Sequence, residues 1–123
     1  MNAEEGNDPS SDDVIVLAPK GMLLNRQMLM PFYRRLSVCK QTGRKHVVVD
    51  LSHIQGFGAA LLGWLVTARQ SLEKTGGEVV LAGLSDRSIR ILKVSKLSKF
   101  FKRFPTVEQA VAAFGHSSLY KAA

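Results

Sequence analysis

The stretch HVVVDLSHIQGFGAALLG, residues 46–63, contains the pattern that decides the fold. Val47, Val48 and Val49 form an uninterrupted β-branched run, which is typical of a strand covered on both faces. Gly56 and Gly58 then permit a tight turn. Apolar residues follow at helical spacing, at Ala60, Leu61, Trp64, Leu65, Ala68 and Leu72. The sequence therefore predicts a buried strand that passes through a turn into a helix, the kind of junction where α/β proteins place their sites.

The turn itself offers no nucleophile. Between Phe57 and Leu65 there is no Ser, Thr, Cys, His, Asp, Glu, Lys or Arg. Asp50 ends the predicted strand, where open α/β sheets carry functional carboxylates, so it could bind a cation. No second carboxylate lies nearby in the sequence. We therefore favour a structural role, in which Asp50 accepts hydrogen bonds from the turn near Ser52 and His53.

The 123 residues are of a size for one domain. Cys39 is the single cysteine, which excludes an internal disulfide and any multi-thiolate metal site within one chain. No apolar run approaches the roughly 20 residues needed to cross a bilayer. The acidic start of the chain is unlike a secretory signal peptide. We expect a cytoplasmic protein without a membrane span.

Charge is distributed unevenly along the chain. The formal net charge is +7, with 17 basic and 10 acidic residues. Residues 1–13 carry five of the acidic residues and no Lys or Arg, so residues 14–123 carry 17 − 5 = +12. The composition of residues 1–13 predicts a disordered acidic tail. The basic remainder favours an acidic partner, which could be nucleic acid, an anionic membrane surface or an acidic protein.

The first half of the chain gives strand and helix signals in turn. Residues 14–18 are predicted to form a strand, and residues 22–24 are apolar enough to form a second one paired with it in a hairpin. Asn25 is a good N-cap for the helix that follows. Pro31 lies too deep for an ideal first turn, so this helix either begins near Met30 or is kinked there.

The second half continues the alternation. Residues 78–82 form a predicted strand, and Ser85 is the expected N-cap of the next helix. Residues 101–104 are predicted to form a short edge strand. The capping box Thr106 to Gln109 opens a final helix, which Gly115 is expected to close.

Helices that alternate with strands predict right-handed crossovers and an α/β fold. We expect a mixed, mostly parallel sheet of four to five strands with about four helices. The predicted domain covers residues 14–114, and residues 115–123 are expected to be a frayed C-terminal tail.

Neither a metal nor a cofactor is expected. His46, His53 and His116 show no metal-ligand spacing with one another or with a glutamate. The glycines around the turn are not followed by the Lys-Ser or Lys-Thr of a phosphate-binding loop. No nucleophile, base and orienting group can be assembled from neighbouring residues, so an enzyme is the least favoured class.

The strongest binding signal in the composition is a basic series in the predicted third helix, at Arg87, Arg90, Lys93 and Lys96. Steps of three residues turn by about −60° on an α-helix, so these charges spread over half its circumference and do not form one nucleic-acid face. Apolar residues between them cannot all face one sheet. This combination favours a protein interface with an acidic partner. A solvated basic face without a partner remains an equal alternative.

Several segments together resemble the STAS domain, the fold of anti-sigma factor antagonists. The resemblance rests on Val-Val-Val-Asp-Leu-Ser-x-Ile at 47–54, Gly63 and Leu65 in the next helix, and Gly-Gly-Glu-Val-Val-Leu-Ala-Gly at 76–83. Later residues extend it to about residues 14–114, namely Ile91, Leu92, Leu97, Phe100, Phe104, Thr106, Glu108, Gln109 and Ala110.

The resemblance implies a phosphorylated serine in the turn, whose usual sequence in the family is Asp-Ser-Ser-Gly. This chain has Gly58, Ala59, Ala60 and Leu61 there, so the phosphoacceptor position is Ala59 and carries no hydroxyl. Asp50 belongs to the same turn motif. The acidic residue that the family often carries near the first helix is Leu24 here.

The resemblance also implies a function. We expect a non-enzymatic interaction module that binds an anti-sigma factor or related regulator constitutively, through Leu61, Leu62 and the basic residues Arg87, Arg90, Lys93 and Lys96. A STAS subunit of a stressosome-like or lipid-transport assembly is the main alternative, and nucleic-acid binding is less favoured. The sequence leaves homodimer formation open.

Overall fold

The structure, a computed structural model, describes residues 14–43 and 46–116. In this part of the chain a single sheet contains four strands, all parallel, in the order β1-β2-β3-β4. The strands are β1 (Val14–Leu17), β2 (His46–Asp50), β3 (Glu78–Ala82) and β4 (Arg103–Phe104). The predicted α/β class is confirmed, although the sheet is parallel and not mixed. The predicted acidic tail and residues 117–123 lie outside the described residues.

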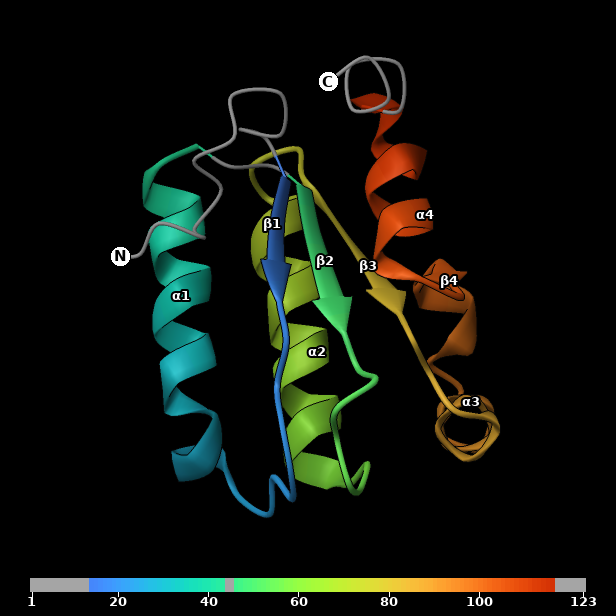
Figure 1. Ribbon diagram of the computed structural model, residues 1–123. Helices are drawn as coiled ribbons and strands as arrows, with labels where there is room; N and C mark the ends of the chain where they lie inside the picture. Colours follow the sequence, from blue (N-terminus) through green and yellow to red (C-terminus); the bar gives the residue numbers. More distant parts are fainter. Residues whose placement is uncertain (1–13, 44–45, 117–123) are drawn as a thin grey trace.

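Helical segments connect the strands. They are η2 (Arg26–Leu29), α1 (Met30–Gln41), α2 (Ala59–Glu73), α3 (Asp86–Val94), η3 (Ser98–Phe100), α4 (Val107–Val111) and the π-helical η4 (Ala112–His116). Figure 1 shows α1 and α2 against one face of the sheet and α4 on the other. Among the described residues, no helix has the length and apolar character to cross a bilayer.

The predicted hairpin between residues 14–18 and 22–24 is wrong. The second segment is not a strand, and its one sheet contact is a parallel bridge between Gly21 and Ile54. Because β1 and β2 are parallel, the chain must return through a crossover, here α1, before β2 begins. Met22 and Leu24 consequently lie exposed at the end of the sheet, with 48% and 70% of their surface accessible.

Local capping explains where the helices begin. Asn25 Oδ1 accepts a hydrogen bond from the Met28 backbone N–H, and α1 then starts at Met30. Pro31 therefore lies in the first turn of α1, where its missing N–H breaks no helical bond. Ser85 and Thr106 cap α3 and α4 as predicted.

Gly115 does not close the final helix, contrary to the prediction. The chain continues beyond α4 as the π-helical turn η4, which includes Gly115 and ends at His116. A glycine can end a helix by adopting a left-handed conformation, but its presence does not require one.

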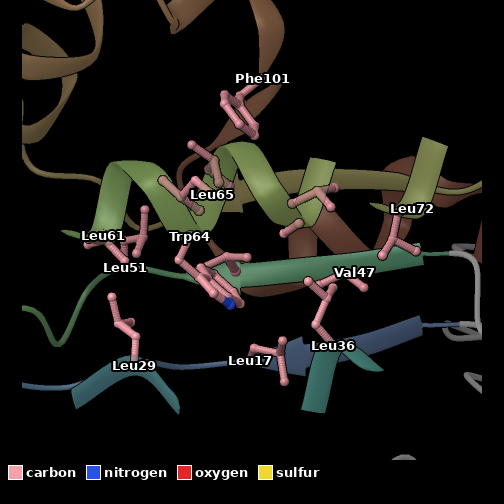
Figure 2. Packing of buried hydrophobic residues seen from close by; sticks show 14 of the residues in the cluster. Leu17, Leu29, Leu36, Val47, Leu51, Leu61, Trp64, Leu65, Leu72 and Phe101 are labelled. Carbon is pink, nitrogen blue, oxygen red and sulfur yellow. The ribbon is translucent and has the colours of Figure 1, made fainter. Parts of the chain in front are cut away.

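The main core lies between α1, α2 and one face of the sheet. Trp64 of α2 is fully buried at its centre, close to Leu17, Leu29 and Leu36 in Figure 2. The ring of Phe32 packs against Trp64 edge to face, with 6.0 Å between centroids. A smaller cluster joins the opposite face of the sheet to α4. The sheet is thus covered on both sides, which explains why Val47 to Val49 form an uninterrupted apolar run.

Gly83 joins β3 to α3 and lies against the end of β2. Its φ is +73°, a left-handed conformation that L side chains rarely adopt. A Cβ atom at this position would lie 2.9 Å from Cβ of Ser52 and 3.1 Å from Oδ1 of Asp50. Gly83 is therefore required by its backbone angle and by the close approach of the two loops.

The packing of Trp64 gives the first prediction. Replacing Trp64 with Ala should lower the free energy of unfolding by about 3–5 kcal/mol, because the substitution leaves a cavity between α2 and the sheet. Trp64→Phe should cost much less, since it keeps most of the contacts and removes an indole N–H that has no hydrogen-bond partner in the described residues. Urea unfolding measures both. Leu24→Ala is the exposed control, and an equal loss in Leu24→Ala would contradict the assignment.

Two glycines provide the second prediction. Gly76 also has a positive φ, +82°, but a Cβ there would meet nothing within 4 Å. Gly76→Ala should therefore cost only the backbone strain, about 1–2 kcal/mol. Gly83→Ala should cost about 1–3 kcal/mol more, because the methyl group collides with Ser52 and Asp50. Equal losses in thermal unfolding would show that the two loops are not in close contact.

Candidate functional site

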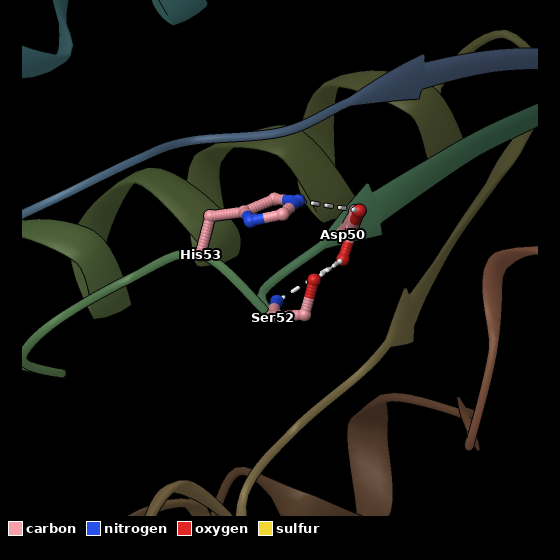
Figure 3. Close-up of polar contacts among 3 residues, drawn as sticks. All are labelled: Asp50, Ser52 and His53. Carbon is pink, nitrogen blue, oxygen red and sulfur yellow. Dashed lines mark hydrogen bonds and ion pairs between the residues drawn. The ribbon is translucent and has the colours of Figure 1, made fainter.

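Asp50 organises the turn that follows β2. Its Oδ1 accepts hydrogen bonds from the Ser52 backbone N–H at 3.0 Å and from the Ser52 hydroxyl at 2.7 Å (Figure 3). Nε2 of His53 lies 3.7 Å from the other carboxylate oxygen. The predicted structural role of Asp50 is confirmed by these contacts with Ser52. The carboxylate fixes the first residues of the loop that leads to α2.

The described residues offer little to a cation. They contain no group of three or more His, Cys, Asp and Glu side chains that could hold a metal ion. The Asp50 carboxylate is already engaged by its own turn. The Asp50 carboxylate therefore holds the backbone of the loop after β2 in place.

The loop presents small residues at the start of α2. Gly58 is the N-cap in an extended conformation, with no side-chain hydrogen bond to the helix. Gly58 and Ala59 are exposed, and Ala60 is half-buried against the core. Position 59 is thus accessible, and it displays only a methyl group.

Leu61 is not available to a partner, which corrects its assignment to the interface. Its side chain is fully buried, because it shares one helical stripe with Trp64, Leu65 and Ala68. Leu62 is half-buried and packs on the same core. Both leucines pack on the core and anchor the first turn of α2 there.

An apolar rim borders the turn, formed by Met22, Leu24 and Met28. All three side chains are at least 45% exposed. Hydrogen bonds between Gly21 and the loop residues His53 and Gln55 fix the segment beside the turn, at 3.0 and 2.9 Å. Sequence reasoning missed this rim because it assigned residues 22–24 to a strand. A signal was available in the sequence. Parallel strands need a crossover between them, so the apolar residues 22–24 could not form a hairpin strand and had to lie in the connection.

Three of the predicted basic residues, Arg87, Arg90 and Lys93, lie on α3 as expected, whereas Lys96 lies beyond the end of the helix at Val94, with a left-handed φ of +63°. Arg87, Arg90, Lys93 and Lys96 are exposed, whereas Leu92 is fully buried. No carboxylate of the described residues lies within 4.0 Å of their charged atoms. Val94, between the charges, is 83% exposed. The expectation that apolar surface accompanies the positive charge is therefore confirmed.

The loop and α3 are neighbours in space. A small cleft of about 60 Å³ separates them, lined on one side by residues 54–57 and on the other by Ser85, Arg87, Ser88 and Ile91. Gly56 in turn lies against Met22, whose sulfur would be 3.1 Å from a Cβ at Gly56. The loop before Gly58 and Ala59 thus has Met22 of the apolar rim on one side and Arg87 of α3 on the other, and we call the surface formed by the rim, this turn and α3 the turn face.

Known proteins share this architecture. The Thermotoga maritima protein TM1081 superposes with a TM-score of 0.73 at 23% identity, over 83% of this chain and 87% of that chain. An anti-sigma factor antagonist from Mycobacterium paratuberculosis gives a TM-score of 0.64 at 26% identity, over 83% and 86%. The phosphorylated form of the Bacillus cell fate determinant SpoIIAA gives 0.66 at 16% identity, over 83% and 91%.

The family follows from the sequence match. The family model for the STAS domain matches residues 10–110, which include all strands of the sheet and the start of α4. The match thus contains the Asp50 turn, the Gly58–Ala59 junction and the basic helix. This chain belongs to the STAS domain family.

Proposed function

We propose that this protein is a non-enzymatic interaction module of the cytoplasm that binds an anti-sigma factor or a related regulator through its turn face. We further propose that this binding is not switched off by phosphorylation of the turn. The observation that carries the proposal is Ala59, an exposed methyl group at the position where the family carries its phosphoacceptor serine.

The charge of the turn decides whether the surface can be switched. A phosphate adds about −1.5 to −2 charges and three strong acceptor oxygens. Ala59 cannot receive one, and no hydroxyl lies between Phe57 and Leu65. The supporting parts of the turn, including the Asp50 to Ser52 hydrogen bonds, are nevertheless present. The turn at Gly58 and Ala59 therefore stays free of negative charge, which we propose is its binding-competent state.

The rest of the turn face indicates the chemistry of the partner. Arg87 lines the cleft beside the loop, Arg90 and Lys93 follow it on α3, and Lys96 lies just beyond the helix. Against these four positive charges, residues 86–96 contain a single acidic residue, Asp86. Met22, Leu24 and Met28 add apolar surface on the other side of the turn. A partner segment with acidic residues beside an apolar anchor would complement both parts.

A permanent subunit of a larger STAS assembly is the second candidate, because an unswitchable turn also suits constitutive packing between subunits. Affinity purification of the full chain from its own cells distinguishes the two. Recovery of a sigma-regulatory kinase supports the first function, and recovery of stressosome-like or lipid-transport subunits supports the second.

The turn provides a direct prediction. Ala59→Glu should weaken recovery of the partner by about tenfold or more, because a negative charge then meets an acidic surface. Ala59→Ser should bind like the unmodified protein, since a hydroxyl adds no charge. Equal binding by all three proteins, measured by calorimetry with the recovered partner, would place the interface elsewhere.

The basic helix provides a separate prediction. Arg87→Glu combined with Arg90→Glu should reduce affinity by about tenfold or more and weaken its salt dependence. Arg34→Glu combined with Lys40→Glu changes the charge equally on α1, away from the turn face, and should have little effect. An equal loss in both double variants would indicate a response to net charge alone. In electrophoretic assays at low salt, the unmodified protein and both double variants should not shift DNA or RNA. A shift that is lost only in the variant with Arg87→Glu and Arg90→Glu would favour nucleic acid as the partner.

A further inference from the structure

A second concave surface lies at the other end of α2. It is a hollow of about 450 Å³ whose lining includes Arg69, Glu73, Lys99, Phe100 and Lys102, and we call it the basal pocket. Arg69 and Glu73 follow Ala59 on α2 by 10 and 14 residues, which places the pocket about 15–21 Å along the helix from the turn. Its volume is within the range of small-molecule sites.

The topology of the sheet creates this hollow. β4 has only two residues and pairs with β3 only at Leu81 and Ala82. The first residues of β3, Glu78 and Val79, therefore line an open notch beside Lys102. The last turns of α2 and the short helix η3 form the other walls.

Two cations converge on one aromatic ring in the pocket. The guanidinium carbon of Arg69 lies 4.8 Å from the centroid of the Phe100 ring, and Nζ of Lys99 lies 5.6 Å from it. Phe100 is nevertheless 44% exposed. Both cations also line the open hollow, so an anion in it could interact with either of them. The exposed part of the ring offers apolar contact to the body of the same molecule.

The balance of charge limits what this anion can be. Glu73 pairs with Arg69 at 2.9 Å, and Glu78 pairs with Lys102 at 3.4 Å. Lys99 has no carboxylate within 4.0 Å among the described residues. Three cations and two carboxylates leave one positive charge, which matches a ligand with a single negative charge.

We propose that the basal pocket binds a small organic monocarboxylate with an apolar or aromatic body. Its carboxylate is bound by Arg69 and Lys99, which both line the pocket, and the guanidinium still has donors beyond the one used by Glu73. Its apolar body covers the exposed Phe100 ring. This site is independent of the turn face and of the function proposed for it.

Naphthoate titrated into the full chain tests the proposal, with naphthamide as the neutral probe of the same shape. Calorimetry should show saturable binding of naphthoate at one site and binding at least about tenfold weaker for naphthamide. In amide NMR spectra the signals that move should belong to Arg69, residues 76–78 and residues 99–102. Lys99→Met, which keeps most of the apolar stem, should weaken naphthoate by about tenfold. Lys40→Met on the exposed side of α1 should leave it unchanged.

Several outcomes would overturn the proposal. They are the absence of saturation at millimolar naphthoate, equal binding of naphthamide, an unchanged affinity in Lys99→Met, or displacement of naphthoate by an equal concentration of inorganic phosphate. Comparing the two probes needs no variant, so the result stands even if Lys99→Met folds poorly. Loss of partner binding by Ala59→Glu would be unaffected by any of these results.

Discussion

Four parallel strands that follow one another in sequence order constrain everything else in this molecule. Each connection must carry the chain back to the same end of the sheet, and crossovers of one hand place the connecting helices on one face. The loops after β1, β2 and β3 are therefore gathered at the carboxyl edge, where hydrogen bonds join Gly21 to His53 and Gln55, and where Gly83 lies against Asp50. The turn face follows from this arrangement. The basal pocket lies at the opposite edge, because β4 is too short to cover the start of β3.

Features that depend on neighbouring residues were predictable from the sequence. Ser85 and Thr106 cap their helices because a hydroxyl accepts a hydrogen bond from an amide three residues later, which needs no tertiary information. The run Val47 to Val49 indicated a strand buried on both faces, because consecutive residues of a strand point to opposite sides of the sheet. Strand and helix signals in turn predicted the order of the elements, apart from the hairpin, and the role of Asp50 followed from its place at the end of a strand beside Ser52.

Features that depend on distant residues were not predictable. Residues 22–24 have the composition of a strand, but the crossover to β2 leaves Met22 and Leu24 on the surface and buries Leu23 alone. Leu61 and Leu62 are the same residue type at adjacent positions. The rotation of the helix between them turns Leu61 fully into the core and leaves Leu62 half-buried. Position 83 needs a small residue because it lies against Asp50 and Ser52, more than thirty residues away in the chain. The basal pocket joins α2, β3 and η3, and no local pattern connects them.

The geometry of Ser52 bears on whether another hydroxyl could replace the missing switch. Ser52 is exposed and close to the turn, but its hydroxyl donates to Asp50 at 2.7 Å. A phosphate on this oxygen would remove the donor and place about −1.5 to −2 charges beside a carboxylate. The repulsion would loosen the residues that hold the loop, and Gly83 leaves them little room to move. Phosphorylation at Ser52 would therefore disturb the hydrogen bonds of the turn itself, whereas the side chain of Ala59 is exposed and takes no part in them. Ser52 is therefore no equivalent site for the charge that we propose Ala59 excludes.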